Sequence, residues 1–128
     1  MRVLIVENDA VVTKLWERWL SDFYTVEIAN SVDLAIESIK RNMPDIVLLD
    51  LRLNGPTNSG LEVYEYIRRE LEKDTPIIFI TGLEFNIDLY KKAEEKVEID
   101  IQRGLCTSMV QKPISIQTLG KLVADAVT

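Results

Sequence analysis

The 128-residue sequence predicts one α/β domain in which helices wind around both faces of a five-stranded parallel sheet. Two observations predict this class. Apolar runs of strand length alternate with segments of helical spacing, and the runs at 45–49 and 76–80 are apolar at nearly every position. Parallel strands carry apolar residues on both faces because helices cover both. No internal repeat, low-complexity segment or linker divides the chain, so we treat residues 1–128 as one domain.

The predicted strands are short runs bounded by polar, glycine or proline residues. In chain order they are 2–6 (RVLIV), 25–29 (TVEIA), 45–49 (DIVLL), 76–80 (PIIFI) and 108–111 (SMVQ).

The segments between these strands place apolar residues three or four positions apart, which predicts helices. Ser31 is a good N-cap for the second helix, and the third and fifth helices begin near Gly60 and Ser115. The segment 86–102 is the fourth helix. Its predicted buried face consists of Ile87, Tyr90, Val97 and Ile101.

The first helix follows Asp9, which we expect to be its N-cap rather than a metal ligand. Its apolar face is wider than the stripe that packs against a sheet. We therefore expect a residue at the edge of that face, such as Val11 or Leu20, to be exposed.

Composition and charge exclude several classes of function. The net charge of −6 argues against direct binding of nucleic acid, and the basic pairs at 68–69 and 91–92 are expected on solvated helix faces. The absence of histidine removes histidine-dependent catalysis and histidine metal ligands. The single cysteine, Cys106, cannot form an internal disulfide and is expected to be a small buried residue.

The sequence also argues against contact with a membrane. No apolar run approaches the ~20 residues of a membrane span. The start MRVLIV does not resemble a signal peptide because it is short and soon acidic. Both features favour a cytoplasmic location.

Polar residues follow four of the predicted strands where each strand ends: Glu7 and Asn8, Asp50, Thr81, and Lys112. In an open α/β sheet these ends meet at the edge where ligands bind. The carboxylates suit a hard cation such as Mg²⁺, while a hydroxyl and an ammonium can hold phosphoryl oxygens.

Four motifs carry a resemblance over nearly the whole chain. VLIVEND, DIVLLDLRL, TPIIFITG and VQKP occur in this order, each at the end of a predicted strand. With them the sequence resembles a CheY-like response-regulator receiver domain of two-component signalling. The resemblance implies a flavodoxin-like, three-layer α/β/α fold with strand order 2-1-3-4-5.

The resemblance makes Asp50 the acceptor of a phosphoryl group from a histidine kinase or phosphotransfer protein. It implies that Mg²⁺ is held by Glu7, Asn8, Asp50 and the backbone carbonyl of Arg52. The only chemistry implied is Mg²⁺-dependent self-phosphorylation and slow autodephosphorylation. The output is a changed surface for an unknown downstream protein.

The resemblance also assigns the residues around the acceptor. Thr81 and Lys112 contact the phosphoryl oxygens, and Thr81 acts with Met109 in the conformational switch of the fourth helix, fifth strand and fifth helix. Arg52 and Leu83 occupy the two positions that tune autodephosphorylation. Met109 stands where the family often has an aromatic switch residue, which predicts a shallower switch.

The sequence departs from the family in two ways. Asn8 replaces the usual aspartate that ligates the metal directly, so weaker metal affinity is expected. The connections from Asp50 to Gly60 and from Thr81 to Lys112 are also longer than usual. These departures keep open a second reading, a pseudo-receiver that binds partners without being phosphorylated.

Two other classes share the winding of the fold but fit the residues poorly. A flavodoxin-type FMN carrier needs a phosphate loop rich in Ser, Thr and Gly after the first strand, where this chain has ENDAVV. A haloacid-type phosphatase needs a second aspartate two residues after its nucleophile, and here that residue is Arg52.

Overall fold

The computed structural model describes residues 1–53, 59–82 and 87–128, and it confirms the predicted fold class. Five parallel strands form one sheet in the order β2-β1-β3-β4-β5. β3 and β4 begin and end one residue later than predicted, so Asp50 and Thr81 are the last residues of their strands. The strands are β1 (Arg2–Val6), β2 (Thr25–Ala29), β3 (Ile46–Asp50), β4 (Ile77–Thr81) and β5 (Thr107–Gln111).

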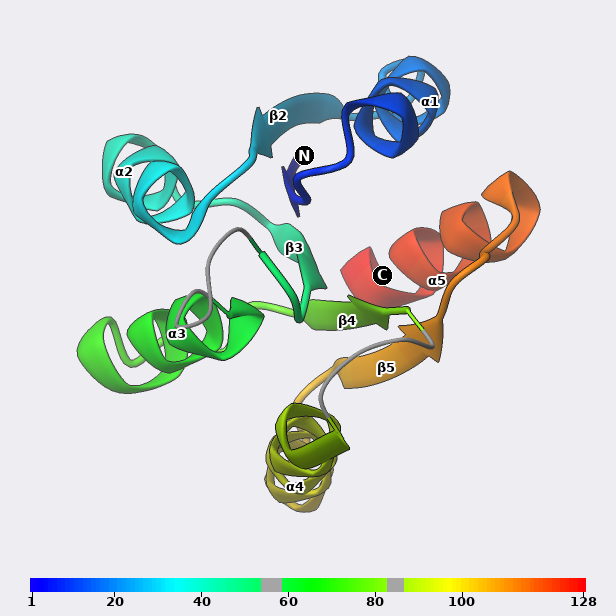
Figure 1. Cartoon of the computed structure of the whole chain (residues 1–128). Coiled ribbons are helices and arrows are strands. Elements are labelled where there is room, and N and C mark those ends of the chain that lie inside the picture. The colour runs from blue at the N-terminus through cyan, green and yellow to red at the C-terminus, as the bar shows by residue number, and fades with distance from the viewer. Residues whose placement is uncertain (54–58, 83–86) are drawn as a thin grey trace.

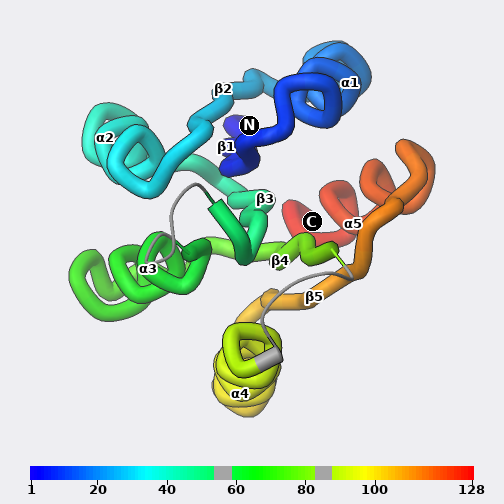
Figure 2. Tube along the Cα trace, in the orientation of Figure 1, coloured from blue at the N-terminus to red at the C-terminus, as the bar shows by residue number. Residues whose placement is uncertain are grey.

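Helices cover both faces of the sheet (Figure 1). α1 (Ala10–Leu20) and α5 (Ile116–Val127) lie on one face, and α2 (Val32–Arg41), α3 (Gly60–Glu65) and α4 (Ile87–Gln102) lie on the other. The Cα trace in Figure 2 shows the same three layers, with β3 between β1 and β4. The three-layer α/β/α architecture is therefore as predicted.

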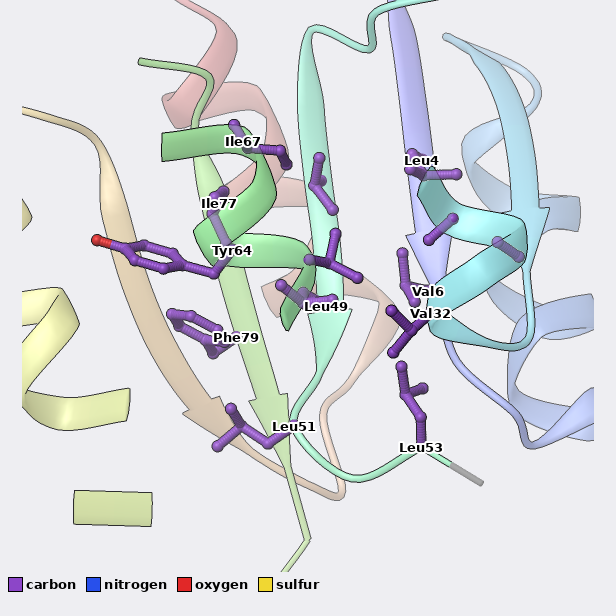
Figure 3. Packing of buried hydrophobic residues seen from close by; sticks show 14 of the residues in the cluster. Leu4, Val6, Val32, Leu49, Leu51, Leu53, Tyr64, Ile67, Ile77 and Phe79 are labelled. Atoms are coloured by element: carbon purple, nitrogen blue, oxygen red, sulfur yellow. The ribbon is translucent and has the colours of Figure 1, made fainter. Parts of the chain in front are cut away.

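Each face of the sheet has its own apolar core. Alternate residues of one strand enter different cores, as in β3, where Val47 and Leu49 face α2 and α3 while Leu48 faces α1 and α5. All five residues of β3 and all five of β4 are buried, as expected for central parallel strands. Figure 3 shows the core on the α2 and α3 side.

The third helix differs from its prediction in the second half. α3 ends at Glu65 and continues as a π-helical segment, η1 (Tyr66–Glu70), which periodicity at three- and four-residue spacing did not reveal. Arg68 in this segment is 8% exposed, whereas the side chain of Arg69 is 79% exposed. The prediction that both arginines lie on a solvated face is thus wrong for Arg68.

The predicted buried face of α4 is confirmed in part, since Tyr90 and Val97 are half-buried and Val97 packs against the core. Ile101 is 61% exposed, whereas Ala93 and Asp100 are completely buried. The apolar pattern placed Ile101 in the interior instead of Asp100. It could not show that hydrogen bonds from other elements stabilise the buried Asp100 carboxylate. The side chain of Ile87 lies outside the described part of the chain. Cys106, expected to be buried, is exposed.

The N-termini of the first two helices confirm the capping predictions. Asp9 Oδ1 accepts hydrogen bonds from the amides of Val11 (3.0 Å) and Val12 (3.3 Å), and Ser31 Oγ accepts one from the amide of Leu34 (3.2 Å). Val11 is 78% exposed as predicted for an edge residue, whereas Leu20 is fully buried. Within residues 1–53, 59–82 and 87–128, no helix is both long and apolar enough to cross a bilayer.

Candidate phosphoacceptor site

The site lies at the edge where the parallel strands end. Glu7 directly follows β1, Asp50 ends β3, Thr81 ends β4 and Lys112 directly follows β5. Since β1, β3 and β4 are neighbours in a parallel sheet, their ends meet at one edge. Residues separated by 105 positions in the sequence therefore come into contact.

Lys112 joins the two acidic side chains. Its Nζ donates to Glu7 Oε1 at 2.6 Å and to Asp50 Oδ2 at 3.3 Å. Glu7 is 1% exposed and Asp50 is 6% exposed, so both carboxyl groups are largely withdrawn from water. The positive charge of the ammonium group offsets part of the cost of burying these two carboxyl groups.

The electrostatics of the site are dominated by burial. Burial and the hydrogen bond with Asp50 raise the pKa of Glu7 from 4.5 to about 8, although Lys112 acts in the opposite direction. Burial alone would lower the pKa of Lys112. The hydrogen bond to Glu7 and the negative charge of Asp50 outweigh it, so the pKa is raised and Lys112 remains a cation.

One oxygen of this site has no internal partner. Glu7 Oε2 is buried and accepts no hydrogen bond. A buried carboxylate oxygen of this kind is costly unless a cation or donor reaches it. It lies beside a second carboxylate, Asp50, and this pair suits Mg²⁺, which takes one or two carboxylates and keeps several waters.

The other two predicted metal ligands, Asn8 and Arg52, could offer a cation only neutral oxygens. Asn8 is exposed and follows Glu7 in the chain, and Arg52 is exposed two residues after Asp50. Within the described residues, no group of three or more Asp, Glu, Cys or His side chains has a geometry suited to a metal ion. The residues present fit a cation held by Glu7 and Asp50 with neutral oxygens around it.

Arg52, Ser59 and Gly60, on either side of the loop after β3, lie close to Asp50 and its neighbours. The Arg52 amide donates to Asp50 Oδ1 at 3.1 Å, and Arg52 pairs with Ser59 in an isolated antiparallel bridge. The Gly60 amide donates to the Leu51 carbonyl at 2.9 Å. A Cβ atom at position 60 would collide with the backbone carbonyl oxygen of Asp50, so this position requires glycine. Residues 54–58 of the longer loop lie outside the described part.

The structure describes three of the four residues predicted to act in switching or in tuning dephosphorylation. Thr81 is 1% exposed, and its hydroxyl donates to the Gly82 carbonyl at 3.3 Å. The Lys112 amide donates to the Thr81 carbonyl at 2.7 Å, which ties β4 to the end of β5. Met109 is half-buried and packs against the core on the α3 and α4 side. Leu83 lies outside the described residues.

Sequence reasoning did not anticipate a cavity beside the site. This cavity has a volume of about 500 Å³. Apolar residues of α1, including Trp16, line it together with Lys112 and Ile114. The wide apolar face of α1 was the available signal. Lys112 lines the cavity and also contacts Glu7 and Asp50.

The family profile of the response regulator receiver domain matches residues 3–124, which is nearly the whole chain. The chain belongs to the receiver domain family of response regulators. This membership agrees with the strand order and with the carboxylates, hydroxyl and lysine that the fold gathers at the strand ends.

Curated relatives of this receiver domain include bacterial regulatory proteins. The transcriptional regulatory protein DltR of Streptococcus agalactiae is 39% identical over 83 residues, covering 64% of this chain and 36% of that protein. The regulatory protein LuxO of Vibrio cholerae is 40% identical over 79 residues, covering 61% of this chain and 17% of its own length. The chain thus spans about a third or less of the length of these relatives.

Solved structures agree with the fold. A signal receiver domain assigned to the LuxO repressor of Vibrio parahaemolyticus is 28% identical with a TM-score of 0.77, covering 98% of this chain and 88% of that one. A CheY-like receiver domain of Methanospirillum hungatei has a TM-score of 0.77 at 20% identity, covering 98% and 92%. At that identity the second likeness speaks for the fold alone.

Proposed function

We propose that this receiver domain is a cytoplasmic phosphorylation switch in which Asp50 accepts a phosphoryl group from a histidine kinase or phosphotransfer protein. The observation that carries the proposal is the contact of one lysine with two buried carboxyl groups at the ends of parallel strands. Lys112 thereby joins the ends of β1, β3 and β5 around one group of charges. This group suits transfer of an anionic group, where positioning and charge neutralisation do most of the work.

The transfer consists of one bond exchange. A carboxylate oxygen of Asp50 attacks the phosphorus of the donor's phosphohistidine, forming a P–O bond as the P–N bond breaks, and the donor imidazole keeps the electron pair. Lys112 Nζ, 3.3 Å from Asp50 Oδ2, lies where it can face the transferred oxygens. Later attack by water on phosphorus returns Asp50 and releases phosphate, so the chemistry is confined to self-modification.

Mg²⁺ would supply positive charge to the phosphoryl oxygens during transfer. Glu7, Asn8, Asp50 and the Arg52 carbonyl are the residues proposed to hold it. The unpartnered Glu7 Oε2 supports this assignment, because a bound cation would give this buried carboxyl oxygen a partner. Asn8 supplies no charge, so the affinity should be lower than in a receiver with a third carboxylate.

The new phosphoryl group is proposed to act through Thr81 and Met109. Both are at the β4–β5 side of the sheet. The Thr81 hydroxyl donates to the Gly82 carbonyl at 3.3 Å, and Met109 is half-buried. Movement of the hydroxyl toward the phosphoryl group would repack the α4–β5–α5 surface for a downstream protein. Arg52 and Leu83 are proposed to set how long the phosphoryl group survives.

The second candidate function is a pseudo-receiver that binds partners without phosphorylation. Asn8 favours it, because an amide replaces a charge at the metal position. It also predicts a different chemical outcome, since the Asp50 carboxylate would then remain unmodified.

Labelling with acetyl phosphate separates the two candidates. The parent protein is incubated with acetyl phosphate and Mg²⁺, and its intact mass is followed over time by mass spectrometry. Asp50→Asn is the matched control. The proposal predicts one added phosphoryl group in the parent and none in the control, followed by slow loss of the group after the donor is removed. Addition in neither protein would establish the pseudo-receiver, and addition in both would place the modification elsewhere.

A further inference from the structure

A second buried polar cluster lies away from the phosphoacceptor site, where β5 begins and α4 ends. It consists of Tyr64 (4% exposed), Arg68 (8%), Asp100 (0%) and Thr107 (5%), and we call it the Asp100 cluster. The four residues come from α3, η1, α4 and β5. Nothing in the proposed phosphotransfer uses them.

Both oxygens of the Asp100 carboxylate are occupied by donors from these other elements. Oδ1 accepts from the Tyr64 hydroxyl at 2.7 Å, and Oδ2 accepts from Arg68 Nε at 3.1 Å and from Thr107 Oγ1 at 2.7 Å. Arg68 makes further bonds, from Nη2 to Thr107 Oγ1 at 3.1 Å and from Nη1 to the Lys73 carbonyl at 2.9 Å. Directional bonds on every side allow only one position of Asp100.

Asp100 also carries the backbone bond that ends α4. The Leu105 amide donates to the Asp100 carbonyl at 2.8 Å, and the Gly104 amide donates to the Ile101 carbonyl at 3.0 Å, with Gly104 at a φ of 77°. These bonds form a Schellman motif. A carboxylate near a helix C-terminus is repelled by the helix dipole, so Asp100 is tolerated here only because the donors of the cluster neutralise it.

Other contacts of α4 include an ion pair from Lys96 Nζ to Glu65 Oε1 at 2.9 Å, between partly exposed side chains, and apolar packing. Among its described side chains, Ala93 is the only apolar one that is buried, while Leu89 and Val97 are half-buried. Ala93 is small and gains little from burial compared with a leucine. The Asp100 cluster is a buried and directional attachment of α4, and it acts at the C-terminal end of the helix.

The cluster is connected to the switch residues through two strands. The Tyr64 ring packs against Phe79 with centroids 5.6 Å apart, as seen in Figure 3. Phe79 lies two residues before Thr81 in β4, and Thr107 lies two residues before Met109 in β5. Residues two apart in a strand face the same side of the sheet, so the cluster and the switch share one packed surface.

We propose that the Asp100 cluster is a latch that holds α4 in its resting position and that α4 leaves this position when the domain switches. This inference rests on the proposed function, because the switch is the one that phosphorylation of Asp50 would drive. Tyr64, Arg68 and Thr107 act as positioning residues. A weaker latch lowers the cost of displacing α4 and so increases the population of the switched state.

Amide hydrogen exchange tests the latch without phosphorylation. Tyr64→Phe and Thr107→Val each remove one donor hydroxyl and leave the Arg68–Asp100 ion pair in place. The matched control is Asp74→Asn, which removes a carboxylate 65% exposed and 3.7 Å from Arg103, just beyond α4. We expect exchange in α4 to be about tenfold faster in both variants, with β1 and β3 unchanged and the control like the parent. Exchange in α4 no faster than in the control, or equal acceleration in α4 and the sheet, would overturn the latch.

Labelling by acetyl phosphate with Mg²⁺ then tests its regulatory role. We expect Tyr64→Phe and Thr107→Val to be labelled about threefold faster than the parent and the Asp74→Asn control. Faster exchange in α4 with unchanged labelling would overturn the regulatory role. If the parent itself is not labelled, the proposed function fails, and the hydrogen-exchange result decides the latch by itself.

Discussion

Among the buried acidic side chains that the structure describes, Glu7 and Asp100 differ in how their oxygens are satisfied. Glu7 is 1% exposed and Asp100 is 0% exposed, and each contacts one basic side chain, Lys112 at 2.6 Å and Arg68 at 3.1 Å. Both oxygens of Asp100 accept hydrogen bonds, whereas Glu7 Oε2 accepts none. The satisfied group fixes a helix, and the unsatisfied group is left able to bind something from outside.

The difference has an energetic meaning. An unsatisfied buried carboxyl group lowers stability, and a protein retains such a group where function requires it. At the sheet edge, burial disfavours the ionised form of Glu7 and raises its pKa to about 8. In the Asp100 cluster both carboxylate oxygens accept hydrogen bonds, so we assign this cluster to positioning rather than to chemistry.

The largest expected effect is in the satisfied region. Arg68→Met removes the cation from a fully buried Asp100 and should lower the free energy of unfolding by about 3–5 kcal/mol, because an uncompensated buried charge remains. Urea denaturation monitored by circular dichroism measures the change.

The control for this variant is Arg103→Met, since Arg103 pairs with Asp74 at the surface with its side chain 54% exposed. We expect less than about 1 kcal/mol there. Similar losses in the two variants would mean that the buried pair contributes no more than an exposed one and would remove the contrast between the two regions.

A smaller effect of opposite sign is expected at Glu7. Its pKa is 4.5 ordinarily and about 8 in the fold, so between these values the unfolded chain loses a proton that the folded chain keeps. The free energy of unfolding therefore falls as pH rises from about 5 to about 8. In Glu7→Gln the side chain cannot ionise, so this decrease should be absent. Between pH 5 and pH 8 the free energy of unfolding of the parent should therefore fall by on the order of 1–3 kcal/mol more than that of the variant.

Denaturation curves at pH 5 and pH 8 without divalent cations measure this difference, with the exposed Glu94→Gln as control. Parallel pH profiles for parent, Glu7→Gln and control would show that Glu7 ionises normally and that the site is not strained.

The smallest expected effect concerns metal affinity. Asn8→Asp adds a charge at the sheet edge and should tighten Mg²⁺ binding by roughly three- to tenfold. Titration calorimetry measures the affinity. Asp9→Asn is the control, because Asp9 caps α1 and asparagine caps equally well, so affinity should not change. Equal affinity in parent and Asn8→Asp would show that residue 8 is not a ligand.

Local patterns were sufficient for the sheet and for the position of the site. The buried strands have a simple apolar signature, and Asp50 and Thr81 follow directly from where those strands end. The roles assigned to the site residues came from the family resemblance, and the structure adds that Glu7, Asp50 and Lys112 are in contact. Those roles remain predictions.

Periodicity failed where a distant partner decides burial. Asp100 and Arg68 are 32 residues apart, and each would be solvated if the other were absent. A pattern that counts charged residues as exposed therefore assigned Ile101 to the interior and Arg68 to the surface. The π-helical turn at Tyr66–Glu70 is equally invisible to three- and four-residue spacing.

Chemical trapping at position 50 tests the central claim most directly. The protein is treated with acetyl phosphate and Mg²⁺ and then with borohydride, which reduces an acyl phosphate to an alcohol, and the peptide that contains Asp50 is sequenced by tandem mass spectrometry. The account predicts homoserine at position 50 in the treated parent and aspartate in a sample that received no acetyl phosphate. Unreduced aspartate at position 50 in a protein that has gained a phosphoryl group would contradict it.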